Sequence, residues 1–261
     1  MTSGAEDALA ARPSRTRPLA RSFVLACLAL VLAGPASAES VRQDRDAGVI
    51  DWTRGLVIAS GAAAADLRAR SPAVARAGAE RRARRQAEQK LERIAETVPL
   101  AGGGEVGAAL DDLDEGDAAE ILSRAAARAI DVDVDYGSDG SVVVRLGLPL
   151  EALRSAVAGP GAAPAGRDSP SGVIVRARDT LDEPALGLKL VAGDERYAPP
   201  VVFTRRAAAG DARLGDDYLE AQATARRGAA IEVDLDPDEL ALARDAGALV
   251  VVVLGRSGDP S

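Results

Sequence analysis

The chain has 261 residues, no histidine and a single cysteine, and its formal net charge is −8. Without histidine, no Ser-His-Asp or Cys-His catalytic set can form, and no zinc site can be built from histidine and cysteine ligands. One cysteine cannot form a disulfide within the chain. The acidic balance argues against nucleic-acid binding, which requires a basic surface toward phosphates.

Residues 1–38 have the pattern of a secretory signal peptide. A basic segment precedes an apolar run from Phe23 to Ala33, which is shorter than the roughly 20 residues of a transmembrane helix. An A-x-A cleavage motif follows, formed by Ala36 and Ala38. We therefore expect an exported protein whose mature chain begins at Glu39.

Cys27 offers an alternative, because Val24-Leu25-Ala26-Cys27 loosely matches a lipobox. We prefer cleavage after Ala38, since the hydrophobic run continues beyond Cys27. The expected location is the periplasm, with association to the outer membrane as the alternative. Membrane contact would then require lipidation or a partner protein.

The first folded region is expected over residues 49–157, after a polar, extended leader at 39–48. A strand is predicted from Ile50 to Gly61, because an apolar, β-branched run lies between Gly55 and Gly61. Trp52 is the only tryptophan. We expect a structural role for it, covering one end of a small core.

A long helix is predicted from Ser71-Pro72 to about Thr97, because serine is a good N-cap and proline suits the first helical position. Its apolar stripe is alanine in the N-terminal half, so the helix must there lie close to its partner or pack against nothing. A shorter helix is predicted over 117–129. A β-hairpin is predicted over 131–136 and 141–148, where Asp/Val alternation favours one solvated and one buried face.

Residues 158–171 are rich in Pro, Gly and Ala and predict a linker. A smaller, β-rich α+β domain is expected over 172–255, followed by a tail at 256–261. Its predicted strands are 172–178, 185–191, 197–203, 220–225, 230–235 and 248–254. A short helix is predicted from Asp236-Pro237 to Asp245. The expected fold class is α+β, with a long helix on a small antiparallel sheet in the first domain.

Three charged segments are candidate binding sites. The Asp131, Asp133 and Asp135 series begins like a calcium loop, but Tyr136 and Val142 stand where an EF-hand needs glycine and glutamate. The loop 111–117 could bind a divalent cation, and the cluster 81–85 could bind phosphate or lipid headgroups. We interpret all three as solvated surfaces, and we assign no catalytic, cofactor-binding or metal-ligating residue.

Several motifs in this order resemble a known family. They are Asp51-Trp52-Thr53 leading to Gly61, the Ala/Arg/Glu helix at 79–87, the hairpin at 140–150, Gly172-Val173-Ile174-Val175 leading to Leu186, Ala212 to Gly215, and the strand 250–253. Together they resemble the twenty-kilodalton outer-membrane lipoprotein family of Gram-negative bacteria, over most of residues 49–255.

That family includes flagellum-associated envelope proteins that build periplasmic disks or rings. The resemblance implies a first domain similar to the dodecin arrangement and no catalytic residues. The chain departs from the family pattern in two places: no cysteine directly follows the apolar run, and Asp179-Thr180 replaces a Gly-Leu pair.

We therefore expect a non-enzymatic, structural or assembly protein of the cell envelope. Its expected partners are envelope proteins or further copies of itself, and its expected contact surfaces are strand edges and the charged helix. The alternative is a periplasmic module that binds a small molecule or a divalent metal. A third hypothesis is an Asp/Glu-dependent hydrolase, although no two carboxylates are placed at a shared site.

Overall fold

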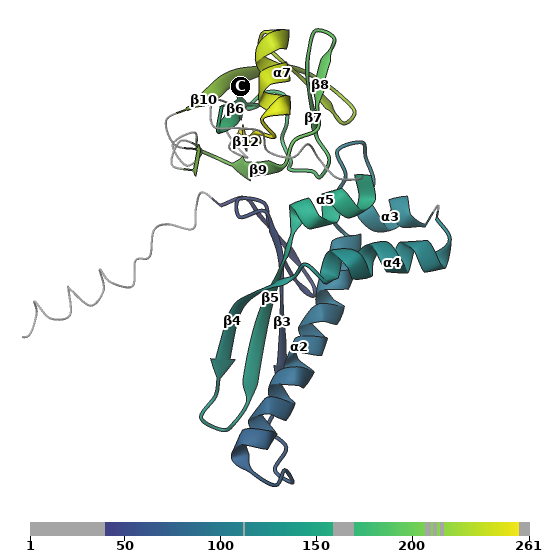
Figure 1. The fold of residues 1–261 in the computed structure, drawn as a ribbon, viewed down its shortest axis with the longest axis vertical. Coiled ribbons are helices and arrows are strands. Elements are labelled where there is room, and N and C mark those ends of the chain that lie inside the picture. The colour runs from purple at the N-terminus through teal and green to yellow at the C-terminus, as the bar shows by residue number, and fades with distance from the viewer. Residues whose placement is uncertain are drawn as a thin grey trace, which may run out of the picture. The chain divides into compact units, whose positions relative to one another are not determined.

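The computed structural model describes residues 40–111, 113–158, 170–206, 210, 213–214 and 217–255. Within them lie two β-sheets and five α-helices, so the fold is mixed α+β (Figure 1). Several predicted features lie outside the described residues: the signal peptide 1–38 with Cys27, Ala36 and Ala38, the first mature residue Glu39, most of the linker 158–171, and the tail 256–261.

The first sheet has five strands in the order β1-β2-β3-β5-β4, and all neighbouring strands are antiparallel. The expected leader at 39–48 contributes the edge strand β1. The strands are β1 (Arg42–Arg45), β2 (Gly48–Asp51), β3 (Leu56–Ala63), β4 (Ile130–Tyr136) and β5 (Val142–Pro149).

A turn at Trp52–Gly55 separates β2 from β3, so the prediction of one strand from Ile50 to Gly61 is wrong. The buried Asp51 carboxylate accepts a hydrogen bond from the backbone N–H of Arg54 at 2.9 Å. Gly55 has a φ of +69°, a conformation that glycine adopts without steric cost. These local turn contacts outweigh the strand propensity of the flanking residues.

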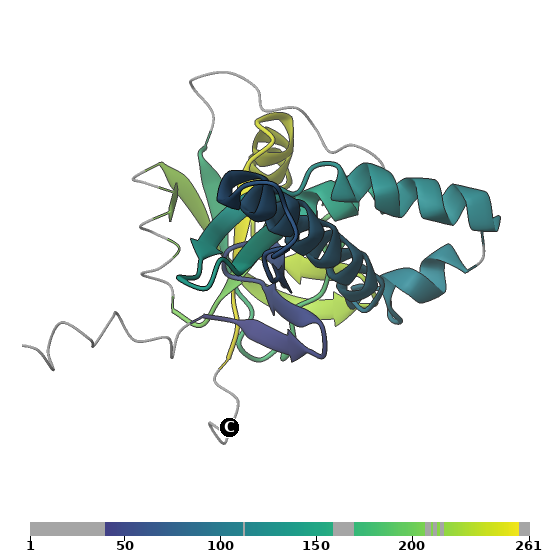
Figure 2. The same cartoon turned by 90° about the horizontal axis from the view of Figure 1, so that it is seen from below.

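Helix α2 (Pro72–Glu96) lies over β3 and β5 of the first sheet (Figure 2). It begins as predicted, since the Ser71 hydroxyl accepts a hydrogen bond from the Val74 N–H. Gly61 lies inside β3 and not at its end: an added Cβ would stand 1.9 Å from the Ala83 carbonyl oxygen. The fully buried face of α2 consists of Ala79, Ala83, Ala87, Leu91, Ile94 and Ala95.

Strands β4 and β5 form the predicted hairpin, but the predicted alternation of buried valines fails. A β-bulge between Asp131 and Asp133 shifts the register of β4 against β5. Val132 consequently lies against Gly147, and 38% of its surface is exposed. Gly61 faces α2 and pairs with Val144, so Gly147 and Val132 belong to the opposite face of the sheet.

Three shorter helices also belong to this part of the chain: two lie between α2 and β4 in the sequence, and one follows β5. Helix α4 (Glu115–Ala126) corresponds to the helix predicted over 117–129, and it packs against α2 and α5 (Leu150–Ala158). Helix α3 (Val106–Leu110) was not predicted, because five residues give too short a pattern to recognise.

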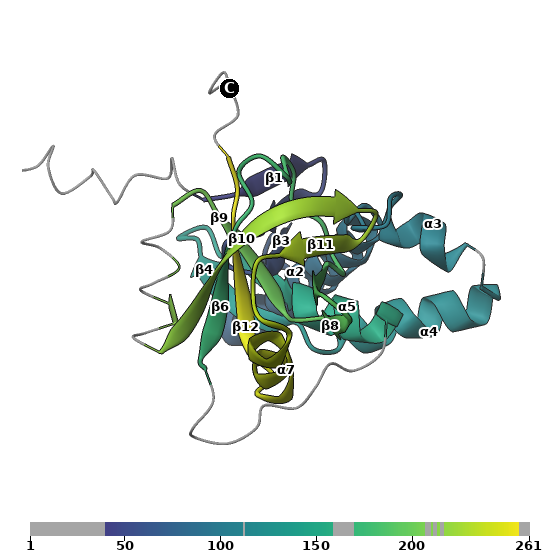
Figure 3. The same cartoon turned by 90° about the horizontal axis from the view of Figure 1, so that it is seen from above.

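The second sheet has seven strands in the order β8-β7-β11-β10-β6-β12-β9, with parallel and antiparallel neighbours. Helix α7 (Pro237–Asp245) lies against β7 and β8 (Figure 3). The closing strand β12 was predicted over 248–254, and it is buried with parallel neighbours on both sides. The strands are β6 (Gly172–Arg176), β7 (Lys189–Ala192), β8 (Glu195–Tyr197), β9 (Val201–Thr204), β10 (Tyr218–Arg227), β11 (Ala230–Val233) and β12 (Leu249–Val253).

Two predicted strands of this region are wrong in extent. The segment 197–203 is two strands, because Pro199 and Pro200 separate β8 from β9, which form opposite edges of the sheet. Only the end of 185–191 is strand. Leu186 instead donates its N–H to the Pro99 carbonyl and accepts from the Ala101 N–H, both at 2.8 Å.

The described residues belong to one compact unit, and one hydrophobic core cluster contains residues of both sheets. Contributors from the first sheet include Val57 and Leu148, and contributors from the second include Val173 and Val250. The division into two domains at 158–171 therefore stays a prediction.

Candidate functional site

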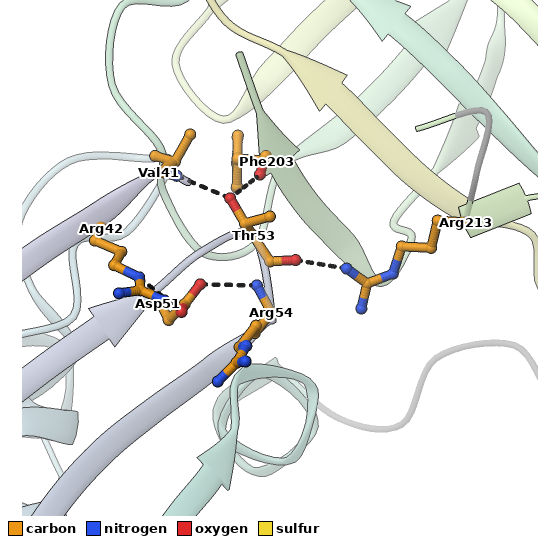
Figure 4. A network of polar contacts seen from close by, with 7 residues as sticks. All are labelled: Val41, Arg42, Asp51, Thr53, Arg54, Phe203 and Arg213. Carbon is orange, nitrogen blue, oxygen red and sulfur yellow. Dashed lines mark hydrogen bonds and ion pairs between the residues drawn. The ribbon is translucent and has the colours of Figure 1, made fainter. Parts of the chain in front are cut away.

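The turn that connects β2 to β3 is bonded to strand β9 of the second sheet. The Thr53 hydroxyl accepts a hydrogen bond from the Val41 N–H at 2.8 Å and donates one to the Phe203 carbonyl at 2.8 Å (Figure 4). The Phe203 N–H in turn donates to the Trp52 carbonyl at 3.1 Å. Residues far apart in sequence thus meet at this turn.

Trp52 is almost completely buried, with 1% of its surface exposed. Its ring meets the ring of Phe203 edge to face, at 5.5 Å between centroids and an interplanar angle of 87°. Among the described residues, its indole N–H is a buried polar group without a hydrogen-bond partner. Trp52 therefore packs from the turn against β9, and its indole N–H has no acceptor among these residues.

A cavity of about 180 Å³ lies beside this turn. Its wall is formed by the turn itself, the start of α5, the loop 185–187, the segment 199–203, Arg213 and Leu249. The apolar part of the wall includes Trp52, Leu150, Leu186, Val202 and Phe203, all of which are buried.

The charged part of this wall is basic, although the chain as a whole is acidic. Among the described residues that line the cavity, three are arginines, Arg54, Arg154 and Arg213, and one is an acid, Glu151. These arginines lie in three segments that share no motif, so the sequence does not predict that they meet.

The three arginines are held differently. Arg154 is buried and forms a two-bond pair with Glu151, at 2.7 Å and 2.6 Å, and this hydrogen bonding raises the pKa of Arg154. Arg213 donates to the Thr53 carbonyl at 2.5 Å, as Figure 4 shows. The guanidinium group of Arg54 is exposed and has no hydrogen-bond partner among the described residues.

A second candidate surface is the free edge formed by β4. Strand β4 pairs only with β5, so the other side of its backbone has no neighbouring strand within the described residues. Ile130 and Tyr136 are 50% and 49% exposed, and Val132 is also exposed. These residues are three of the seven large hydrophobic side chains that are exposed in the described part of the chain.

The carboxylates that resembled a calcium loop do not converge. Asp131 pairs with Arg84 of α2 at 2.7 Å, and Asp133 pairs with Arg145 of β5 at 2.5 Å. The acidic loop after Leu110 borders a different hollow, of about 790 Å³, with Glu92 and Glu96 on its wall. Among the described residues, no group of three or more Asp, Glu, His or Cys side chains is placed to hold a metal ion.

The chain matches no protein-family model, and no curated protein matches it at a significant level. The resemblance to the outer-membrane lipoprotein family thus rests on the sequence motifs alone. In the part of the chain that the structure describes, none of the helices is both long enough and apolar enough to cross a membrane.

Proposed function

We propose that this chain is an exported, non-enzymatic protein of the cell envelope that acts through protein–protein contacts as a structural or assembly component. The family resemblance suggests association with the flagellum and a location in the periplasm or at the outer membrane. In this proposal the helix α2 on its antiparallel sheet is the dodecin-like first domain, and the second sheet forms a second domain.

The observation that carries this proposal is the β4 edge. A free edge presents unpaired backbone N–H and C=O groups, which a strand of another chain can bind by β-augmentation. Two of the three aspartates of β4 are already neutralised by Arg84 and Arg145. The charges that usually protect an edge from pairing are thus weakened here, while apolar side chains stay exposed.

The proposed partner is an extended strand, supplied either by a second copy of this chain or by another envelope protein. Crosslinking the tagged full-length protein in its native cells, followed by membrane fractionation and identification of the partners, tests the proposal. Recovery of crosslinked multimers or of flagellar and ring components in the envelope fraction is expected. A monomer that crosslinks to no envelope protein would overturn the proposal.

A further inference from the structure

The cavity beside Trp52 combines a buried apolar wall with an excess of arginine side chains. We infer that it is a binding site for a small organic carboxylate, a ligand with one negative group and a compact apolar body. This inference does not depend on the proposed assembly function, because the cavity and the β4 edge use different residues.

The size of the cavity limits the apolar body of the ligand. Its volume is about 180 Å³. An apolar cavity of about 150 Å³ is large enough to bind benzene. A single six-membered ring, or an aliphatic chain of similar volume, therefore fits this cavity.

The apolar wall favours an organic acid over an inorganic anion. Trp52 and Phe203 present two aromatic rings, and Leu150, Leu186 and Val202 add aliphatic side chains. Burial of apolar ligand surface against such a wall is favourable in proportion to the area removed from water. Inorganic phosphate would match the charge of the arginines but would leave this wall without a partner.

The arginines supply the recognition of the negative group. A guanidinium group has five N–H donors in a planar fork that matches a carboxylate, and the paired hydrogen bonds give specificity as well as energy. Arg154 already donates hydrogen bonds to the Glu151 carboxylate, and Arg213 donates one to the Thr53 carbonyl. Arg54 keeps all its guanidinium donors available, so it is the principal carboxylate-binding residue of this site.

The test uses the fluorescence of Trp52, the single tryptophan of the chain, as the reporter of binding. Benzoate is titrated into the full chain, and benzamide, which has the same ring without the charge, is the matched control ligand. We expect a saturable change with benzoate at millimolar concentrations or below. Benzamide should bind at least about tenfold more weakly, since it lacks the charge-assisted hydrogen bonds.

Two variants assign the binding to the cavity. Arg54→Gln should weaken benzoate binding about tenfold or more, as expected for a lost hydrogen bond to a charged group. The control is Arg85→Gln, on the exposed face of α2, which should bind as the unchanged protein does. The melting temperature of each variant shows whether it is folded, and Arg213→Gln is the second cavity variant if Arg54→Gln does not fold.

Three results would overturn the inference. The first is the absence of a saturable fluorescence change with benzoate. The second is equal binding of benzoate and benzamide, which would show that the arginines do not select a charge. The third is unchanged benzoate binding in the folded variants of the cavity arginines.

Discussion

Thr53 and Phe203 are separated by 150 residues in the sequence, yet the Thr53 hydroxyl donates a hydrogen bond of 2.8 Å to the Phe203 carbonyl. The same hydroxyl accepts the N–H of Val41. One side chain therefore links the start of the first sheet, the β2–β3 turn and strand β9. This turn also lines the cavity, so the stability of the turn and the shape of the cavity depend on the same contacts.

Thr53→Val should destabilise the protein by about 1–3 kcal/mol, because the substitution keeps the shape of the side chain but leaves buried backbone groups without a partner. Urea unfolding of the variant and the unchanged protein measures this difference. Thr224→Val is the matched control, since the Thr224 hydroxyl is exposed and forms a longer bond of 3.2 Å to Glu232. Equal losses in the two variants would contradict the assigned role of Thr53.

Trp52→Ala should cost about 3–5 kcal/mol of the free energy of unfolding, the range for removing a large buried aromatic side chain. Trp52 is 1% exposed and contacts the Phe203 ring, so its removal leaves a cavity between the turn and β9. Tyr136→Ala serves as the control, because Tyr136 is 49% exposed. An unchanged melting temperature for Trp52→Ala would show that this packing does not stabilise the fold.

Gly61→Ala should destabilise the first sheet by at least about 1–3 kcal/mol, the usual cost of overpacking. The added Cβ would lie 1.9 Å from the Ala83 carbonyl oxygen, so the backbone of α2 would have to move. Gly102→Ala is the control, since an added Cβ there meets no atom within 4 Å. Thermal unfolding of the two variants compares them, and a stable Gly61→Ala protein would contradict the close helix–sheet approach.

Ile130→Lys should reduce self-association or partner capture through β4, because lysine on an edge strand opposes pairing with another strand. The matched control is Leu242→Lys on α7, since Leu242 is 48% exposed and Ile130 is 50% exposed. Sedimentation of the purified variants and crosslinking in cells give the measurement. If the two substitutions reduce association equally, the effect is not specific to the β4 edge.

Tyr197 should remain protonated above the pH at which an unperturbed tyrosine ionises, about 10. Burial, together with the charge of Glu151, raises its pKa, and its hydroxyl donates to the Ala248 carbonyl at 2.6 Å. Because the folded-state pKa is the higher one, the stabilisation is complete below about pH 10 and is lost as the pH rises through the folded-state pKa. A tyrosinate absorbance titration of the folded protein, with Tyr197→Phe as the control, should show this late ionisation.

The elements that could be predicted from the sequence are those whose signals are local. Ser71 and Pro72 begin α2, and Asp236 caps α7 with a capping box, through contacts that reach only a few residues along the chain. The strand predicted over 220–225 is β10, because the alternation of Ala221, Ala223 and Ala225 favours a strand despite the helix propensity of alanine. Such contacts depend on which residues stand a few positions apart, so they can be predicted from the sequence.

Errors arose where a distant or unpatterned contact decided the conformation. The β-bulge beside Asp133 turns Val132 away from α2, and no residue pattern in β4 predicts this bulge. Leu186 leaves its predicted strand because its backbone bonds to Pro99 and Ala101. Backbone hydrogen bonds of this kind are available to every residue type except proline, which lacks the N–H, so side-chain identity does not encode them.

By itself, the sequence determined the α+β class and the long alanine-faced helix, because hydrophobic spacing and helix capping are local properties. Only the tertiary structure decided that Trp52 meets Phe203, and that the wall of one cavity receives Arg54, Arg154 and Arg213. The physical reason is that such a wall forms only when both sheets bury their apolar surfaces in one core. Packing of this core brings together chain segments that are far apart in sequence, and no local residue pattern predicts which segments meet.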